Sequence, residues 1–245
     1  ESEQPAALAL PVDQKPLAVR PEAKMPYAHI DGVGKPVSRI FAGAMWAQNI
    51  NHACVLYDAF VEYGGTAFDT AWVYGGGNSD RLLGQWMKLR GNRKQVVVMI
   101  KGAHTPLCDP EHLTGQLFES LDRMQTDYTD IYTMHRDNPE IPAGEFIDVV
   151  NEHMRAGRIH AFGVSNWSLD RVEEANTYAK AHGLRGISGV SNNLSLARMI
   201  DAPWKGCIAA SDPASREWFL RTRLPLLAWS SQAQGFFALG DSPKW

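Results

Sequence analysis

Residues 66–80, TAFDTAWVYGGGNSD, place a carboxylate and a phenol five residues apart, just after a predicted strand. The strand covers 66–68, and residues 78–80 are typical of a helix start with capping side chains. Asp69 and Tyr74 therefore lie on a loop that leads from a strand to a helix. In parallel α/β folds, such loops carry the chemistry. Read alone, these two residues are explained more simply as a turn cap and a half-buried aromatic.

The alternation of strand and helix continues along the whole chain. Predicted strands cover residues 40–44, 66–69, 95–101, 130–135, 159–165, 186–191 and 224–230, and predicted helices cover 51–63, 80–90, 111–124, 144–156, 169–182 and 214–221. Residues 27–40 carry a hairpin signal around an Asp-Gly-Val-Gly turn. Seven strands in this order favour an α/β fold of the (β/α)8 TIM barrel type over a doubly wound sheet, with the hairpin as an N-terminal cap.

The two ends of the chain differ from a regular barrel. Residues 1–25 are rich in proline, alanine and charge without periodicity, so we expect a linker-like or disordered segment before a single barrel domain at 26–245. Too few residues follow the seventh strand for another βα unit. We therefore expect the last βα units to be absent, which leaves three explanations: a fragment, a barrel completed by a further segment or by an oligomer, or an open barrel.

Composition excludes several function classes. Lys and Arg number 24 against 27 Asp and Glu, with a net charge of −3 and a pI near 6.3, so we expect no nucleic-acid partner. The apolar runs are strand-sized, so we expect no membrane segment. The three cysteines form no CxxC pair and the histidines form no HExxH motif. A reduced, cytoplasmic protein without a metal site is the simplest interpretation.

Polar side chains recur where the predicted strands end. A lysine that ends the buried run VVVMIK needs an anion, and Asp69 is the natural partner for Lys101. A lysine cation beside Tyr74 would favour the ionised phenol, as a general acid near neutral pH requires. His135 would orient a substrate oxygen or share the proton. A structural ion pair and a satisfied strand-end histidine remain the alternatives.

Four motifs in order, FDTAWVYG, VVMIKG, DIYTMHRDNP and GVSNW, resemble those of the aldo-keto reductase family. The resemblance implies a catalytic tetrad of Asp69, Tyr74, Lys101 and His135, with Tyr74 as the proton donor. It implies reduction of a small aldehyde or ketone, sugar-like carbonyls included, with NADP(H) as the cofactor. The sequence is similar to a branch of the family whose members are fused to a Rossmann-type dehydrogenase domain, and such a fusion would suit the linker-like residues 1–25.

The resemblance also implies a cofactor site, in which Ser165 and Asn166 hold the nicotinamide carboxamide and Trp229 stacks on the ring. Ser191 and Asn192 stand where the family commonly has glutamine. The full expected set is Ser165, Asn166, Ser191, Asn192, Trp229, Ser230, Ser231 and Gln232. No residue matches the family's grip on the adenosine 2′-phosphate.

The expected substrate lining is Trp46, Trp72, Arg136 and Trp167, although core or rim packing explains each tryptophan equally well. Two other functions stay open. The barrel would bind a nucleotide or a partner with weak turnover, or it would be active only within a longer chain.

Overall fold

The computed structural model describes residues 17–240 and 244–245, so residues 1–16 of the predicted linker-like segment lie outside it. Its main sheet has six strands, each hydrogen-bonded to the next one in the chain, and every pairing is parallel. The strands are β3 (Phe41–Gly43), β4 (Ala67–Ala71), β5 (Val97–Gly102), β6 (Thr129–Met134), β7 (Ile159–Ser165) and β8 (Gly189–Ser191). This is the strand order expected for consecutive units of a (β/α)8 barrel.

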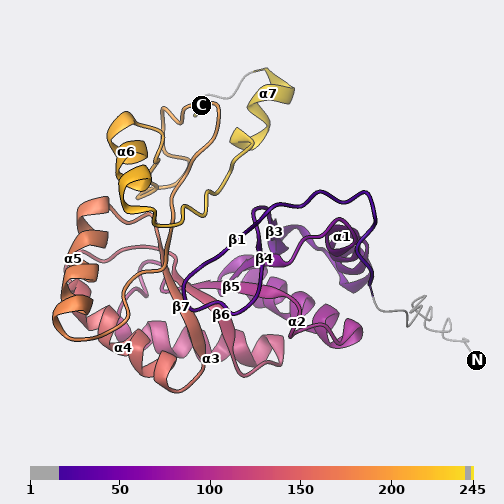
Figure 1. Ribbon diagram of the computed structural model, residues 1–245, viewed down its shortest axis with the longest axis horizontal. Helices are drawn as coiled ribbons and strands as arrows, with labels where there is room; N and C mark the ends of the chain where they lie inside the picture. Colours follow the sequence, from indigo (N-terminus) through magenta and orange to yellow (C-terminus); the bar gives the residue numbers. More distant parts are fainter. Residues whose placement is uncertain (1–16, 241–243) are drawn as a thin grey trace, which may run out of the picture.

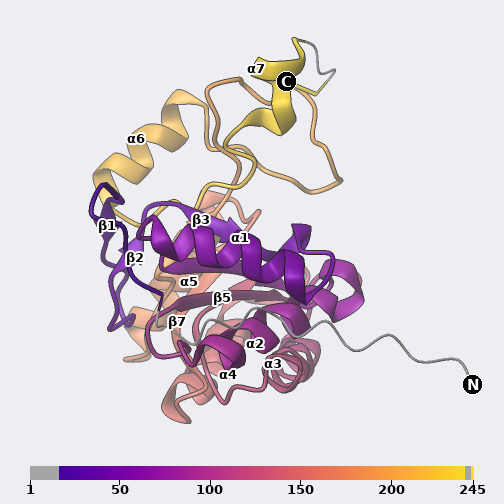
Figure 2. The same cartoon turned by 90° about the vertical axis from the view of Figure 1, so that its right-hand side faces the viewer.

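In the described part of the chain, five helices connect the strands and cover the outside of the sheet, and two more follow β8 (Figures 1 and 2). They are α1 (Ile50–Glu62), α2 (Asn78–Arg90), α3 (Pro110–Met124), α4 (Ala143–Arg155), α5 (Leu169–Ala181), α6 (Pro213–Thr222) and the short α7 (Phe236–Leu239). Short 3-10 turns lie at η1 (Ala44–Trp46), η2 (Tyr74–Gly77) and η3 (Ala233–Gly235). In Figure 1, α6 and α7 lie apart from α2, α3 and α4.

The helix boundaries follow from capping residues. Asn49, Asp109 and Ser168 each precede a helix and accept a hydrogen bond from the backbone N–H three residues on. Gly91 ends α2 with a φ of 61°, a conformation that glycine adopts without a steric penalty. The sequence-based helix predictions agree with the observed helices because these local signals lie in the chain itself.

Side chains of the strands alternate between two cores. One buried cluster joins Val97, Met99 and Ile131 on the inner face of the sheet, and the other contains Val98 and Ile100, which face the helices. The inner cluster also contains Ile30, Val33 and Val37 of the N-terminal hairpin. Burial on both faces explains the continuous apolar strand runs in the sequence.

The predicted hairpin is confirmed, because β1 (Tyr27–Ala28) pairs antiparallel with β2 (Val37–Ser38). It is fixed to the amino ends of the strands by charge. Lys35 Nζ of the hairpin lies 2.6 Å from Asp130 Oδ1, and Arg93, which follows α2, has its Nη1 2.9 Å from the other oxygen of the same carboxylate. The hairpin therefore covers the amino end of the inner core, and the carboxyl end is left for the predicted site.

The prediction of a seventh strand over 224–230 is wrong in its extent. Leu226 and Trp229 form only isolated parallel bridges, to Val190 and Asn193. Pro225 has no N–H to donate, and β8, against which the segment lies, is only three residues long. The segment follows the direction of a barrel strand without forming a continuous ladder.

Candidate functional site

The alternation along the strands places Lys101 and Asp69 on the inner face of the sheet. Lys101 is two residues beyond Met99, and Asp69 is two residues beyond Ala67, both of which belong to the inner core. Lys101 Nζ lies 2.8 Å from Asp69 Oδ2, so the predicted ion pair is confirmed. The Lys101 side chain is 4% exposed and that of Asp69 is 21% exposed.

Burial and charge act against each other in this pair. Burial disfavours the Lys101 ammonium, but the neighbouring Asp69 and Tyr74 more than offset it and raise the pKa of Lys101 above its usual value. Burial raises the pKa of the Asp69 carboxyl, and Lys101 opposes that shift. Asp69 Oδ1 is buried and has no hydrogen-bond partner in the part of the chain that the structure describes. Lys101 therefore remains a cation at neutral pH.

Tyr74 and His135 complete the predicted group. Lys101 Nζ lies 5.4 Å from the centre of the Tyr74 ring, and the rings of Tyr74 and His135 meet edge to face at 5.6 Å. Burial lowers the pKa of His135 well below its usual value, and the charges of Lys101, His104 and Arg136 add to this effect. A neutral imidazole therefore lies beside a half-buried phenol. The structure thus brings together all four predicted catalytic side chains.

The predicted residues at the ends of β7 and β8 form one hydrogen-bonded cluster. Asn166, with a φ of 59°, donates from its backbone N–H to Asn192 Oδ1 at 2.8 Å and from Nδ2 to Ser165 Oγ at 3.0 Å. Ser165 Oγ donates to the Ser191 carbonyl at 2.8 Å. Asn192 Nδ2 donates to the Trp167 carbonyl at 3.0 Å. These contacts fix the Asn166 side chain beside the His135 carbonyl, 3.5 Å away.

The chain after β8 folds back over this cluster, which the sequence did not predict. Asn193 forms an isolated bridge with Ala209, and Ile208 N–H donates to Asn166 Oδ1 at 3.1 Å. The Arg136 guanidinium contacts Cys207 Sγ at 3.7 Å. The irregular stretch between β8 and α6 carries no periodic signal, so its return could not be read from its composition.

The remaining predicted residues lie in several places. Trp229 is half-buried, its ring lies 6.3 Å from Trp204, and Ser230, Ser231 and Gln232 follow it in the turn before η3. Trp46, in contrast, is 71% exposed at the end of η1.

Two predicted lining residues are not brought to the four-residue group. The Trp72 indole donates to Glu119, and its ring lies under the Arg123 guanidinium; both partners are on α3. Trp167 is fully buried against Phe146 of α4 and donates to the Arg136 carbonyl. These contacts make both indoles packing groups, whereas Arg136 lies next to His135 and is 9% exposed.

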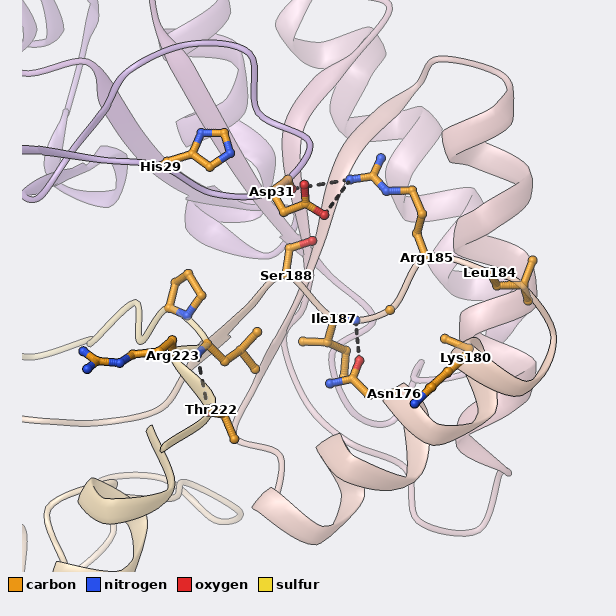
Figure 3. A pocket seen from close by; sticks show the side chains of 14 residues that line it. His29, Asp31, Asn176, Lys180, Leu184, Arg185, Ile187, Ser188, Thr222 and Arg223 are labelled. Carbon is orange, nitrogen blue, oxygen red and sulfur yellow. Dashed lines mark hydrogen bonds and ion pairs between the residues drawn. The ribbon is translucent and has the colours of Figure 1, made fainter. Parts of the chain in front are cut away.

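A cavity of about 590 Å³ lies elsewhere, as Figure 3 shows. It is lined by residues that precede β8 and the 226–229 segment, such as Ser188 and Leu224, and by the Arg185 side chain, whose Nη2 lies 3.9 Å from Asp31 Oδ2. This is the amino edge of the sheet. Tyr74 and Lys101 lie at the carboxyl edge, so this cavity is not the predicted site.

Two other findings concern the kind of site. Within the described residues, no group of three histidine, cysteine, aspartate or glutamate side chains is arranged to hold a metal ion. No helix in that same part of the chain is long and apolar enough to cross a membrane.

Comparison with known proteins agrees with this geometry. Residues 39–205 match the aldo/keto reductase family, and this range holds Asp69, Tyr74, Lys101 and His135. The chain belongs to the aldo/keto reductase family. The chain is 31% identical over 175 residues to the aldo-keto reductase YhdN of Bacillus subtilis (strain 168), which covers 66% of this chain and 53% of that protein.

Other known proteins also match the chain. An aryl-alcohol dehydrogenase of Pestalotiopsis microspora, GME11368, is 28% identical over 167 residues, which covers 63% of this chain and 44% of that protein. The chain thus spans about half the length of the curated relatives it matches. A crystal structure of an aldo-keto reductase from Klebsiella pneumoniae in complex with NADPH superposes with a TM-score of 0.70 at 23% identity. It covers 86% of this chain and 70% of that one, and it supports the fold.

Proposed function

We propose that this chain reduces a small aldehyde or ketone with NADP(H), and that Tyr74 donates the proton. The observation that carries the proposal is the position of the phenol. Its ring lies 5.4 Å from the Lys101 ammonium and 5.6 Å from a neutral His135, at the carboxyl edge of the sheet. The solved NADPH complex of another family member and the match to an aryl-alcohol dehydrogenase support the cofactor and a carbonyl substrate.

Each side chain has a separate task in this reaction. NADPH, when bound, supplies a hydride to the carbonyl carbon and leaves as NADP⁺. The Tyr74 hydroxyl gives its proton to the carbonyl oxygen, so the substrate becomes an alcohol and the Tyr74 side chain becomes a phenolate. The Lys101 cation stabilises that phenolate, and Asp69 holds Lys101 in place. His135, being neutral, directs a ring nitrogen toward the substrate oxygen without repelling Lys101.

The residues near the predicted cofactor site suit a polar ligand. Trp229 Nε1 and Asn193 Oδ1 are buried, and neither has a hydrogen-bond partner among the described residues. A buried polar atom without a partner costs free energy, which a ligand amide would recover. We propose that Ser165, Asn166, Ser191 and Asn192 hold the carboxamide end of the cofactor. Trp229, with Ser230, Ser231 and Gln232 after it, would cover the ring.

The test compares wild-type protein with Tyr74→Phe. NADPH oxidation is followed by absorbance with a panel of small aldehydes, and NADPH affinity is measured by calorimetry. We expect turnover to fall about 100-fold or more, since a positioned proton donor contributes that much. The Kd for NADPH should stay within about twofold of the wild-type value, because the proposed cofactor contacts do not include the Tyr74 phenol. Full turnover in Tyr74→Phe would refute Tyr74 as the donor.

One observation favours a second candidate, a barrel that binds a nucleotide or a partner with weak turnover. Asn166 Oδ1 already accepts a hydrogen bond from Ile208 N–H at 3.1 Å, so a bound cofactor would bring its nicotinamide end into the reactive position only by displacing this contact, which favours weak turnover. The same two measurements, NADPH oxidation and NADPH affinity of the wild-type protein, decide between the two functions. Saturable NADPH binding without oxidation by any aldehyde supports the binding role, and turnover supports the reductase.

A further inference from the structure

The loop that carries Tyr74 has little stiffness of its own. Directly after the tyrosine, the backbone passes through Gly75, Gly76 and Gly77 with φ angles of 57°, 61° and 85°. Glycine adopts this left-handed region freely and for the same reason holds it weakly. A proton donor must nevertheless be held to within a fraction of an ångström of its place. The support must therefore come from a neighbouring element.

Arg123 on α3 supplies contacts on both sides of Tyr74. Its Nη1 donates to the Trp72 carbonyl at 2.9 Å, and its guanidinium lies 5.5 Å from the centre of the Trp72 ring. A Cβ built on Gly77 would lie 2.6 Å from Arg123 Cζ, so the guanidinium also packs directly against the last glycine. The side chain thus touches the loop two residues before the tyrosine and three residues after it.

Arg123 is in turn held by two carboxylates. Its Nη2 donates to Glu119 Oε2 at 2.9 Å, and the same oxygen accepts from Trp72 Nε1 at 2.8 Å. Its Nη1 lies 3.8 Å from Asp80 Oδ2. Glu119 is half-exposed, but the side chain of Asp80 is fully buried, and an Asp–Arg contact in such surroundings is screened little by solvent.

Asp80 connects this arginine to the strand that carries Asp69. Its two carboxylate oxygens accept from Thr70 Oγ1 at 2.7 Å and from Ser120 Oγ at 2.8 Å. Thr70 follows Asp69 in β4, Asp80 lies in the first turn of α2, and Ser120 lies on α3. Helices α2 and α3 lie side by side in Figures 1 and 2. One buried carboxylate therefore joins the strand before the loop, the helix after it and the helix beneath it.

We propose that Arg123, anchored by Asp80, is a positioning residue that holds Tyr74 against Lys101 and His135. The inference rests on the proposed reductase function and adds to it the support for the proton donor. Its contacts in residues 17–240 are with the loop and with carboxylates on helices. Removing Arg123 should therefore lower turnover through the tyrosine and leave NADPH affinity unchanged, since the proposed cofactor residues lie on β7, β8 and beyond.

The test compares Arg123→Met with Arg93→Met as a matched control. The two arginine side chains are 15% and 16% exposed, and each contacts a fully buried aspartate, Asp80 or Asp130. Arg93 lies at the amino edge of the sheet, away from Tyr74. We measure kcat and KM for NADPH and 4-nitrobenzaldehyde, NADPH affinity by calorimetry, and the urea midpoint.

We expect Arg123→Met to lower kcat about 10- to 100-fold with an unchanged NADPH Kd, because a small misplacement of a reacting group has an effect of this size. Arg93→Met should lower the urea midpoint and keep kcat. Arg123→Lys, which retains a cation and a donor, should recover part of the lost kcat. Equal kcat losses in the two methionine variants, or wild-type kcat in Arg123→Met, would overturn the inference.

Two further measurements keep the inference testable. If Arg123→Met does not fold, Gly77→Ala and Gly76→Ala replace it. Both introduce a side chain at positive φ, but only position 77 would clash with Arg123, whereas position 76 has open space. Gly77→Ala should then lose more kcat. If the wild type turns over no aldehyde, the reductase proposal fails. The positioning role of Arg123 is then tested by amide hydrogen exchange at residues 72–78 in place of kcat. Faster exchange in the Arg123 or Gly77 variant than in its control supports the positioning role, and equal exchange refutes it.

Discussion

The ion pair between Lys101 and Asp69 predicts a destabilisation that depends on pH when only one partner is removed. Lys101→Met keeps most of the side-chain volume and removes the cation 2.8 Å from Asp69 Oδ2. Breaking a buried pair in this way costs about 3–5 kcal/mol, because a buried charge is left without compensation. We expect a loss of this size at pH 7 in the free energy of unfolding, measured by urea titration with tryptophan fluorescence.

The sign of the pH dependence follows from the carboxyl group. Burial already raises the pKa of Asp69, and Lys101 opposes that shift, so losing Lys101 raises it further. A carboxyl whose folded pKa is above its unfolded value of about 3.9 loses stability as the pH rises between the two. The penalty of Lys101→Met relative to wild type should therefore shrink as the pH falls from 7 toward about 4, because the raised folded pKa of Asp69 lies above the unfolded one. The slope is at most about 1.4 kcal/mol per pH unit for one group.

The double variant Lys101→Met/Asp69→Asn is the control. It has no carboxyl at this position, so its penalty relative to wild type should not grow as the pH rises, in contrast to that of the single variant. A penalty for Lys101→Met that is equal at pH 4 and pH 7, or below about 1 kcal/mol at pH 7, would be the value expected of a surface pair. Either result would show that the pair is not buried as the structure has it.

Two other predictions test packing and charge. Gly84→Ala should destabilise the protein by about 1–3 kcal/mol, since its Cβ would lie 2.5 Å from the Met124 backbone. Gly115→Ala, on the exposed side of α3, should instead stabilise the protein by up to about 1 kcal/mol, because alanine favours the helix. Urea midpoints that move in the same direction for both variants would contradict this prediction. Burial lowers the pKa of His135 well below its usual value, so its imidazole should not titrate between pH 6 and 8 by NMR. The stability that the neutral ring contributes is complete above the unfolded pKa of about 6.5, and it is lost as the pH falls from there through the lower folded pKa. A His135 midpoint near 6.5 would show an exposed ring.

Local patterns in the sequence predict the elements well. The run that ends in Lys101 indicates both a buried strand and the need for a counter-ion, because a charged side chain among five apolar ones has few ways to be satisfied. The period of two along each strand explains why Asp69 and Lys101 share one face of the sheet. The same kind of apolar run led to the wrong prediction of a full strand over 224–230. Its pairing is limited by β8, which is only three residues long, and by Pro225, which has no N–H to donate.

The tryptophans show where such patterns end. Position after a strand predicts that Trp72 and Trp167 lie near the site, but it does not predict the direction of each indole. Trp72 turns toward Glu119 and Arg123 on α3, and Trp167 turns into the core against Phe146. Both directions depend on partners that lie on other helices. No periodicity within the strand or loop contains that information.

Arg123 is missing from the sequence-based site for the same physical reason. In the chain it is an ordinary basic residue in the last turn of an amphipathic helix, and its contacts with the Tyr74 loop join residues 51 positions apart. The three glycines after Tyr74 indicate flexibility, which is correct for the isolated loop. In the folded chain the conformation is held from outside, by a guanidinium that a Cβ at Gly77 would displace. Glycine at that position is thus favoured both by its φ of 85° and by the arginine beside it. The positioning of the proposed proton donor then depends on a helix that contributes no residue to the reaction.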